Sequence, residues 1–276
     1  MNKKHFKIFA ACALTLIIGY AEASAYSQNQ LGVNEDYLVE KLSDPNRQLT
    51  PNIYGYSKEQ YEVVKRHERD LLTNKEFVRY LVRQMNQLGY LNNESIKNPE
   101  IHKKAAGFTA TLASNLFTKG LRRLPYEDQF KILELWLIGV QRVSDEDCVC
   151  FFEGAPTVAM QQKMASNLML SYYPNELERY YEIYRKAIFA EVADAPAVRR
   201  LSMTQYKFAE EALDNFIQKN LNQLDPKTRK LIATSMSPSA SKAARCAGWK
   251  FTYDCALKVE GQTGEWLLQA FLNDMQ

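Results

Sequence analysis

Apolar side chains recur at intervals of three and four residues along most of this chain. This spacing is typical of amphipathic α-helices, whereas strict alternation would indicate half-buried strands. No run alternates apolar and polar residues in the way that a strand requires. One clear helical stripe consists of Phe77, Val78, Leu81, Val82, Met85 and Leu88. Gly89 follows it directly, and glycine commonly ends helices. The pattern predicts an all-α fold of roughly nine or ten helices.

The segment from Phe130 to Val143 is apolar on most of its helical faces. Its strongly polar residues are Lys131, Glu134, Gln141 and Arg142. A helix that is apolar on most sides is surrounded by other helices, and this one is too short and too charged to span a bilayer. We therefore expect it to lie at the centre of a compact multi-helix domain.

Local capping signals mark where other helices begin. Ser57 and Gln60 form a capping-box pattern, and Thr73 is placed to cap the next helix. Further starts are expected at Asn98-Pro99-Glu100, Thr157, Asn175-x-x-Glu178, Asp225-Pro226, Pro238 and Glu265. The segment that contains Cys148 and Cys150 is interpreted as a turn.

The helix that starts at Pro99 carries many small residues, namely Ala105, Ala106, Gly107, Ala110, Ala113 and Ser114. Small side chains let a neighbouring helix approach closely. The apolar helix over 126–143 follows directly in sequence, and we expect it to be that neighbour.

The first 25 residues have the three parts of a secretory signal peptide. Lys3, Lys4 and Lys7 form the basic start, residues 8–18 form the apolar run, and Ala23-Ser24-Ala25 is a cleavage pattern. Cleavage leaves an N-terminal arm over 26–53 and a single helical domain over 54–276. The mature protein is expected to be periplasmic or secreted, without stable membrane insertion.

The charge of the mature chain is close to neutral. Removal of residues 1–25 takes away three Lys and one Glu, which leaves 32 basic and 31 acidic residues of the original 35 and 32. This balance does not favour a nucleic-acid partner, which normally needs a clustered basic surface. The short basic clusters at 122–123, 199–200 and 227–230 are interpreted as solvated helix ends.

Four cysteines remain after cleavage, at Cys148, Cys150, Cys246 and Cys255. An even number in an oxidising compartment favours disulfides. If Cys246 and Cys255 share one straight helix, they are about 13 Å apart on opposite sides, beyond the reach of a bridge. Cys148 and Cys150 are too close in sequence to pair without strain. We therefore expect two long-range bridges from the Cys148/Cys150 segment to the Cys246–Cys255 segment, each closing a loop of about 100 residues.

Candidate chemistry is sparse. The mature chain has two histidines, His67 on an apolar helix face and His102 in the first turn of its helix, and neither has metal-pair spacing. Cys148-Val149-Cys150 could hold a soft metal through two thiolates, but the methionines and histidines give it no support. No cofactor and no metal are expected, and none of the common hydrolase, zinc-peptidase or nucleotide-binding motifs occurs.

Two short patterns suggest enzymes of the cell envelope. Ser239-Ala240-Ser241-Lys242 resembles the Ser-x-x-Lys motif of penicillin-binding proteins, although the partner motifs are missing. Glu94-Ser95 resembles the Glu-Ser step of lytic transglycosylases, again without the other elements. An envelope hydrolase or lyase that uses carboxylate or Ser/Lys chemistry on peptidoglycan or lipid is therefore one hypothesis.

A second hypothesis starts from the dense tyrosines between residues 172 and 184. A tyrosine stripe at helical spacing is most often core, and the alternative is an apolar groove of a small-molecule carrier. The hypothesis that we favour is an exported helical protein that binds another envelope or secreted protein without catalysis. Its role would be that of an inhibitor or immunity protein, or of an accessory factor for secretion or envelope assembly.

Overall fold

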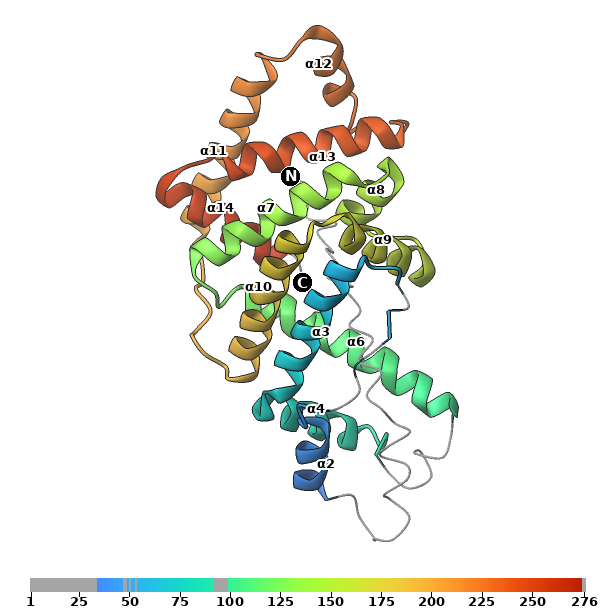
Figure 1. Cartoon of the computed structure of the whole chain (residues 1–276). Coiled ribbons are helices and arrows are strands. Elements are labelled where there is room, and N and C mark those ends of the chain that lie inside the picture. The colour runs from blue at the N-terminus through green and yellow to red at the C-terminus, as the bar shows by residue number, and fades with distance from the viewer. Residues whose placement is uncertain (1–33, 47–48, 50, 53, 92–98, 275–276) are drawn as a thin grey trace.

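The computed structural model describes residues 34–46, 49, 51–52, 54–91 and 99–274. These residues form twelve α-helices and no strand (Figure 1), which confirms the all-α prediction. The predicted signal peptide over 1–25 lies outside the described residues. The helix count exceeds the roughly nine or ten expected, and the segment interpreted as a turn is one of the additional helices, α8 (Asp145–Glu153). Ser144 caps this helix, and Asp145, Glu146 and Asp147 in its first turn suit the positive end of the helix dipole.

Three helices form the N-terminal part of the described chain, in the middle and at the lower end of the view in Figure 1. They are α2 (Glu35–Leu42), α3 (Lys58–Thr73) and α4 (Lys75–Gln87). The predicted capping box at Ser57 and Gln60 is confirmed. The cap of α4 is Asn74 rather than Thr73, because Thr73 is still helical and the Asn74 side chain accepts from the Phe77 N–H at 2.9 Å.

Helix α6 (Pro99–Leu121) packs most extensively against α10 (Pro174–Val192). The helix over 126–143, which we expected to be that neighbour, contacts α6 through the rings of Phe117 and Trp136, with centroids 6.3 Å apart, but it is not the main partner. Helices α6 and α10 approach each other closely at Gly120, where an added Cβ would overlap the carbonyl oxygen of Ala187 on α10. Helix α10 begins at Pro174, and the side chain of Glu176, not Glu178, accepts from the Tyr173 N–H at 2.8 Å.

Helix α7 (Tyr126–Arg142) is central, as the sequence predicted. It packs against α8, α9 (Val158–Ser171), α10, α13 (Lys242–Leu257) and α14 (Gly261–Asp274). Its side chains Ile132, Leu133 and Trp136 are almost fully buried. This arrangement gives the domain one continuous core around α7.

The tyrosines between residues 172 and 184 belong mainly to this core. Tyr172, Tyr180, Tyr181 and Tyr184 are buried and lie against one another, whereas Tyr173 is exposed. The Tyr172 hydroxyl donates to the Leu135 carbonyl oxygen at 2.9 Å. These buried rings join α10 to α7.

In the C-terminal third, α13 and α14 contribute side chains to this core. Helix α11 (Met203–Leu221) packs on α14, and α12 (Pro226–Ala233) packs on α13 at the upper end of the view in Figure 1. No side chain of α12 is buried. Three boundaries differ from the prediction: α12 ends at Ala233 rather than Met236, α13 begins after its cap Ser241 rather than at Pro238, and α14 begins at Gly261.

No helix in the described ranges combines the length and the hydrophobicity that a membrane crossing requires.

Candidate interaction site

Helices α8 and α13 are joined by a disulfide between Cys148 and Cys246, whose Cα atoms are 5.7 Å apart. The two positions are 98 residues apart in sequence. One of the two predicted long-range bridges is therefore present. It connects the two helices that carry four of the eight residues lining the site described below.

The second predicted bridge, which would join Cys150 to Cys255, is absent. Both residues are free thiols, and both are buried. Helix α13 is continuous, so Cys246 and Cys255 point to opposite sides, and two positions along α8 likewise turn Cys150 away from Cys148. Each helix can therefore present only one cysteine to the other. Burial raises the pKa of the Cys150 thiol, and that of Cys255 to about 11.

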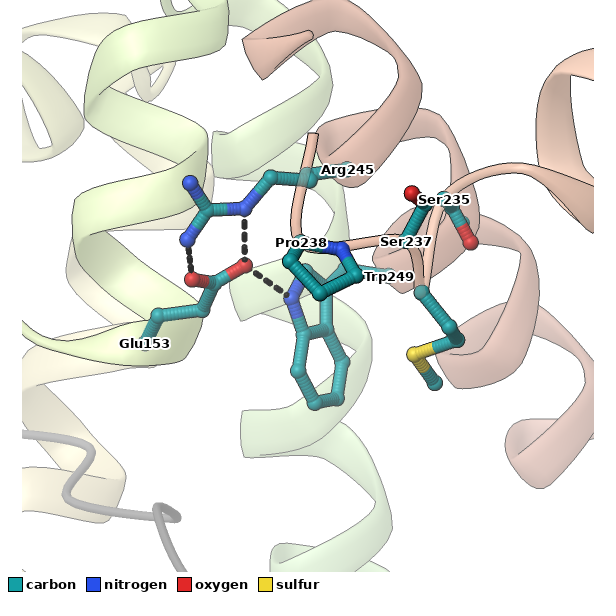
Figure 2. Close-up of a pocket in the computed structure, with 8 residues that line it drawn as sticks. Glu153, Ser235, Ser237, Pro238, Arg245 and Trp249 are labelled. Atoms are coloured by element: carbon teal, nitrogen blue, oxygen red, sulfur yellow. Dashed lines mark hydrogen bonds and ion pairs between the residues drawn. The ribbon is translucent and has the colours of Figure 1, made fainter. Parts of the chain in front are cut away.

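A pocket of about 510 Å³ lies between the end of α8, the first half of α13 and the segment after α12 (Figure 2). It is lined by Glu153, Ser235, Met236, Ser237, Pro238, Arg245, Gly248 and Trp249. Arg245 directly precedes the bridged Cys246. The disulfide thus holds α8 and α13 together beside the pocket.

The polar side of the pocket is a preformed ion pair. Glu153 ends α8, and its Oε1 accepts from Arg245 Nε at 2.9 Å, while Arg245 Nη2 pairs with Oε2. The indole Nε1–H of Trp249 donates to the same Oε1 at 2.9 Å (Figure 2). Because three donors already satisfy this carboxylate, Glu153 is positioned as a structural anchor rather than as a general base.

The apolar side of the pocket is held by close packing. Trp249 stacks on Phe152, with ring centroids 5.5 Å apart and planes 15° from parallel. An added Cβ at Gly248 would overlap the hydroxyl of Ser235, so this approach between α13 and residue 235 requires a glycine. The indole is therefore fixed on both its polar and its apolar sides.

The rim of the pocket carries an exposed apolar side chain. Met236 is 75% exposed, although it follows directly on the buried Ser235. Pro238 is exposed beside it and also lines the pocket. A methionine is unbranched and adapts its shape to a partner, which suits a binding surface.

Sequence reasoning did not single out this pocket. Its two charged residues, Glu153 and Arg245, are 92 positions apart, and each reads as an ordinary helix-end charge. The available signal was Met236, an isolated large apolar residue in the Ser-rich connection over 234–241.

The structure does not assemble Ser239 and Lys242 into a nucleophile and base. The Ser239 hydroxyl lies 2.9 Å from that of Ser237, whereas the Lys242 amine donates to Glu146 at 2.5 Å. The hydrogen bond to Glu146 raises the pKa of Lys242, so the amine stays protonated. A Ser/Lys mechanism needs the opposite, a neutral amine directed at the serine. The other enzyme pattern, Glu94-Ser95, lies outside the described residues.

Histidine 67 is buried more deeply than the sequence suggested. Its ring stacks on Tyr181 at 4.0 Å, and its Nδ1 accepts from Arg185 at 3.2 Å. The pKa of His67 lies well below its usual value, mainly because the imidazole is buried and to a smaller extent because the positive charge of Arg185 is close to it. His67 is therefore a neutral core residue, and the side chain of His102 is not among those described.

No group of three or more His, Cys, Asp or Glu side chains within the described part of the chain could hold a metal ion. The chain has no significant match among the models of known protein families, the curated proteins or the solved structures.

Proposed function

We propose that this chain is an exported helical protein that binds another envelope or secreted protein without catalysis. Its role would be that of an inhibitor or immunity protein, or of an accessory factor for secretion or envelope assembly. The observation that carries this proposal is the pocket formed by α8, α13 and residues 235–238. It combines an exposed Met236 with an indole that is already held in place.

The composition of the pocket supports protein binding. Trp and Arg are enriched among the residues that dominate binding energy at protein interfaces, and Met is common in interface cores. Here the Arg245 charge is already paired with Glu153, so a partner does not have to neutralise it. The fixed indole also loses little conformational freedom on binding, which lowers the entropic cost of association.

The same geometry offers little to a substrate that must react. The carboxylate in the pocket is satisfied by its own neighbours, and Lys242 is held by Glu146 outside it. The accessible lining is about as polar as it is apolar, and its polar part consists of the paired Glu153 and Arg245 and the serine hydroxyls. Such a surface favours recognition of a partner side chain over proton transfer.

The test is affinity capture from an envelope extract, with the oxidised mature chain from Tyr26 as bait. Three baits are compared: the unchanged chain, Met236→Asp and Met203→Asp. Both methionines are exposed, at 75% and 81%, but Met203 begins α11 and is not among the residues that line the pocket. A stoichiometric partner should bind the unchanged chain and Met203→Asp, and should bind Met236→Asp at least about tenfold more weakly.

Equal capture by Met236→Asp and Met203→Asp would show that the pocket is not the binding surface. No stoichiometric partner on a folded and oxidised bait would reject the proposed function.

A further inference from the structure

Helix α12 carries an unbalanced basic charge next to the pocket. Between residues 225 and 234 there are three cations, Lys227, Arg229 and Lys230, and one carboxylate, Asp225. Asp225 caps the helix by accepting from the backbone N–H groups of Lys227 and Thr228, both at 3.0 Å. Within the described part of the chain, no carboxylate pairs with any of the three cations. Arg229 donates to the carbonyl oxygens of Asn222 and Leu224, so the cations available to a partner are Lys227 and Lys230.

The exposed face of α12 combines this charge with an apolar side chain. Lys227, Lys230 and Leu231 follow helical spacing, so they lie on one face, and all three are exposed. Thr228 and Ile232, on the opposite side, are partly buried, and α12 contacts α13. The outward face is thus a short stripe of two cations around Leu231.

This stripe is continuous with the pocket along the chain. Helix α12 ends at Ala233, and Ser235 and Met236 of the pocket lining follow almost at once. Near the pocket itself, Lys242 and Arg245 are already paired with Glu146 and Glu153. Of the cations on α8, α12 and the first half of α13, those of α12 are therefore the ones without a carboxylate partner.

We propose that the pocket and α12 together bind an acidic segment of a protein partner. One apolar side chain of that segment enters the pocket against Met236 and Trp249, and its flanking Asp or Glu residues lie along Lys227 and Lys230. This assignment rests on the proposed function and adds the chemistry of the partner. Complementary charge speeds association and selects among partners, while the apolar anchor supplies most of the affinity.

The shape of the surface favours a protein segment over a lipid surface. Membrane-binding basic clusters combine four to eight cations, usually beside a transmembrane helix or on a long amphipathic helix with a wide apolar face. Helix α12 has eight residues, and its exposed apolar contribution is Leu231 at 40%. A concave pocket suits a single protruding side chain better than a flat bilayer.

The test uses a random-sequence peptide display library panned on the oxidised mature protein at low ionic strength. Two double variants serve as comparison: Lys227→Glu with Lys230→Glu on α12, and Lys58→Glu with Lys75→Glu as the control. The control changes the net charge by the same amount at exposed first residues of α3 and α4. Circular dichroism and a thermal melt confirm that both variants fold.

The enriched peptides should carry net negative charge around an aromatic or aliphatic residue. Their affinity should fall about tenfold or more for the α12 variant, stay within about twofold for the control, and weaken with salt. Neutral or basic peptides, equal binding to the α12 variant, or no enrichment would overturn the acidic partner. Sedimentation with phosphatidylglycerol vesicles at 0.15 M salt should show no binding, and binding that α12 reversal abolishes would assign the surface to lipid instead.

The outcome is separable from that of the proposed function. If envelope capture is lost with Met236→Asp but unchanged with the α12 variant, the protein-binding function stands and the acidic partner is rejected. If neither change affects capture, the pocket is not the binding surface and the acidic partner is rejected, whereas the protein-binding function itself is rejected by the absence of any captured partner.

Discussion

At the scale of single residues, a few polar side chains are buried in the otherwise apolar core, and a few large apolar side chains are exposed. His67, Asp128 and Asp147 are buried, and Asp128 is held by Arg179 at 3.2 Å and Lys186 at 3.2 Å. Met236 and Met203 are exposed. The buried groups interact with neighbouring side chains, so substitutions there should change the stability of the fold. The exposed methionines are accessible to a binding partner.

Neutral His67 makes stability depend on pH. Its folded pKa lies below the unfolded value of about 6.5, so the unfolded chain binds the extra proton. The stabilisation is present above about pH 6.5 and is lost as pH falls, by up to about 1.4 kcal/mol per pH unit. In urea unfolding at pH 7 and pH 5, His67→Phe should lose less stability than the unchanged chain over that interval, by up to about 2 kcal/mol. An identical loss in both proteins would contradict this account of His67.

At the scale of elements, close helix contacts depend on individual glycines. Helix α6 carries both Gly107 and Gly120. Gly107 is exposed and has open space around the position of a Cβ, whereas Gly120 faces the backbone of α10. The same residue type therefore has opposite roles in one helix.

Substitution of these two glycines separates helix propensity from packing. Gly107→Ala should raise the free energy of unfolding by about 0.5–1 kcal/mol, because alanine is the better helix former. Gly120→Ala gains the same propensity but must displace the Ala187 carbonyl, so a net loss of about 1–3 kcal/mol is expected. Urea denaturation midpoints of the two variants measure the difference. A stabilised Gly120→Ala protein would mean that α6 and α10 are not in close contact there.

At the scale of the whole molecule, the Cys148–Cys246 bridge connects distant parts of the chain. It closes a loop that contains α9, α10, α11 and α12. A loop of this length has a nominal stabilising effect of about 4–5 kcal/mol in the chain-entropy model. The bridge also joins the two helices that bear Glu153 and Arg245, so it supports the pocket as well as the fold.

Peptide mapping without reduction should find Cys148 joined to Cys246. Cys150 and Cys255 should resist alkylation in the native protein at pH 8, because both are buried and their thiol pKa values are raised. In guanidinium they should become two reactive thiols in the chain without residues 1–25. A second bridge in the map, or no free thiol after unfolding, would show that all four cysteines from Cys148 onward are paired.

The sequence by itself determined the helical class and many helix boundaries. The apolar periodicity of α4 and the cap at Ser57 depend on neighbours within a few residues, so they are visible in the chain itself. The central position of α7 follows in the same way, because its apolar faces must be covered. Helix α8 was not predicted, because its apolar run is short and the segment that contains Cys148 and Cys150 was interpreted as a turn.

Only the tertiary structure decided which distant residues meet. It placed α10, not α7, against Gly120, and it allowed one bridge where the cysteine count suggested two. It also brought Glu153 to Arg245 and Trp249, residues more than 90 positions away. Such contacts depend on how rigid helices are rotated and packed against one another, and local sequence patterns do not encode that rotation.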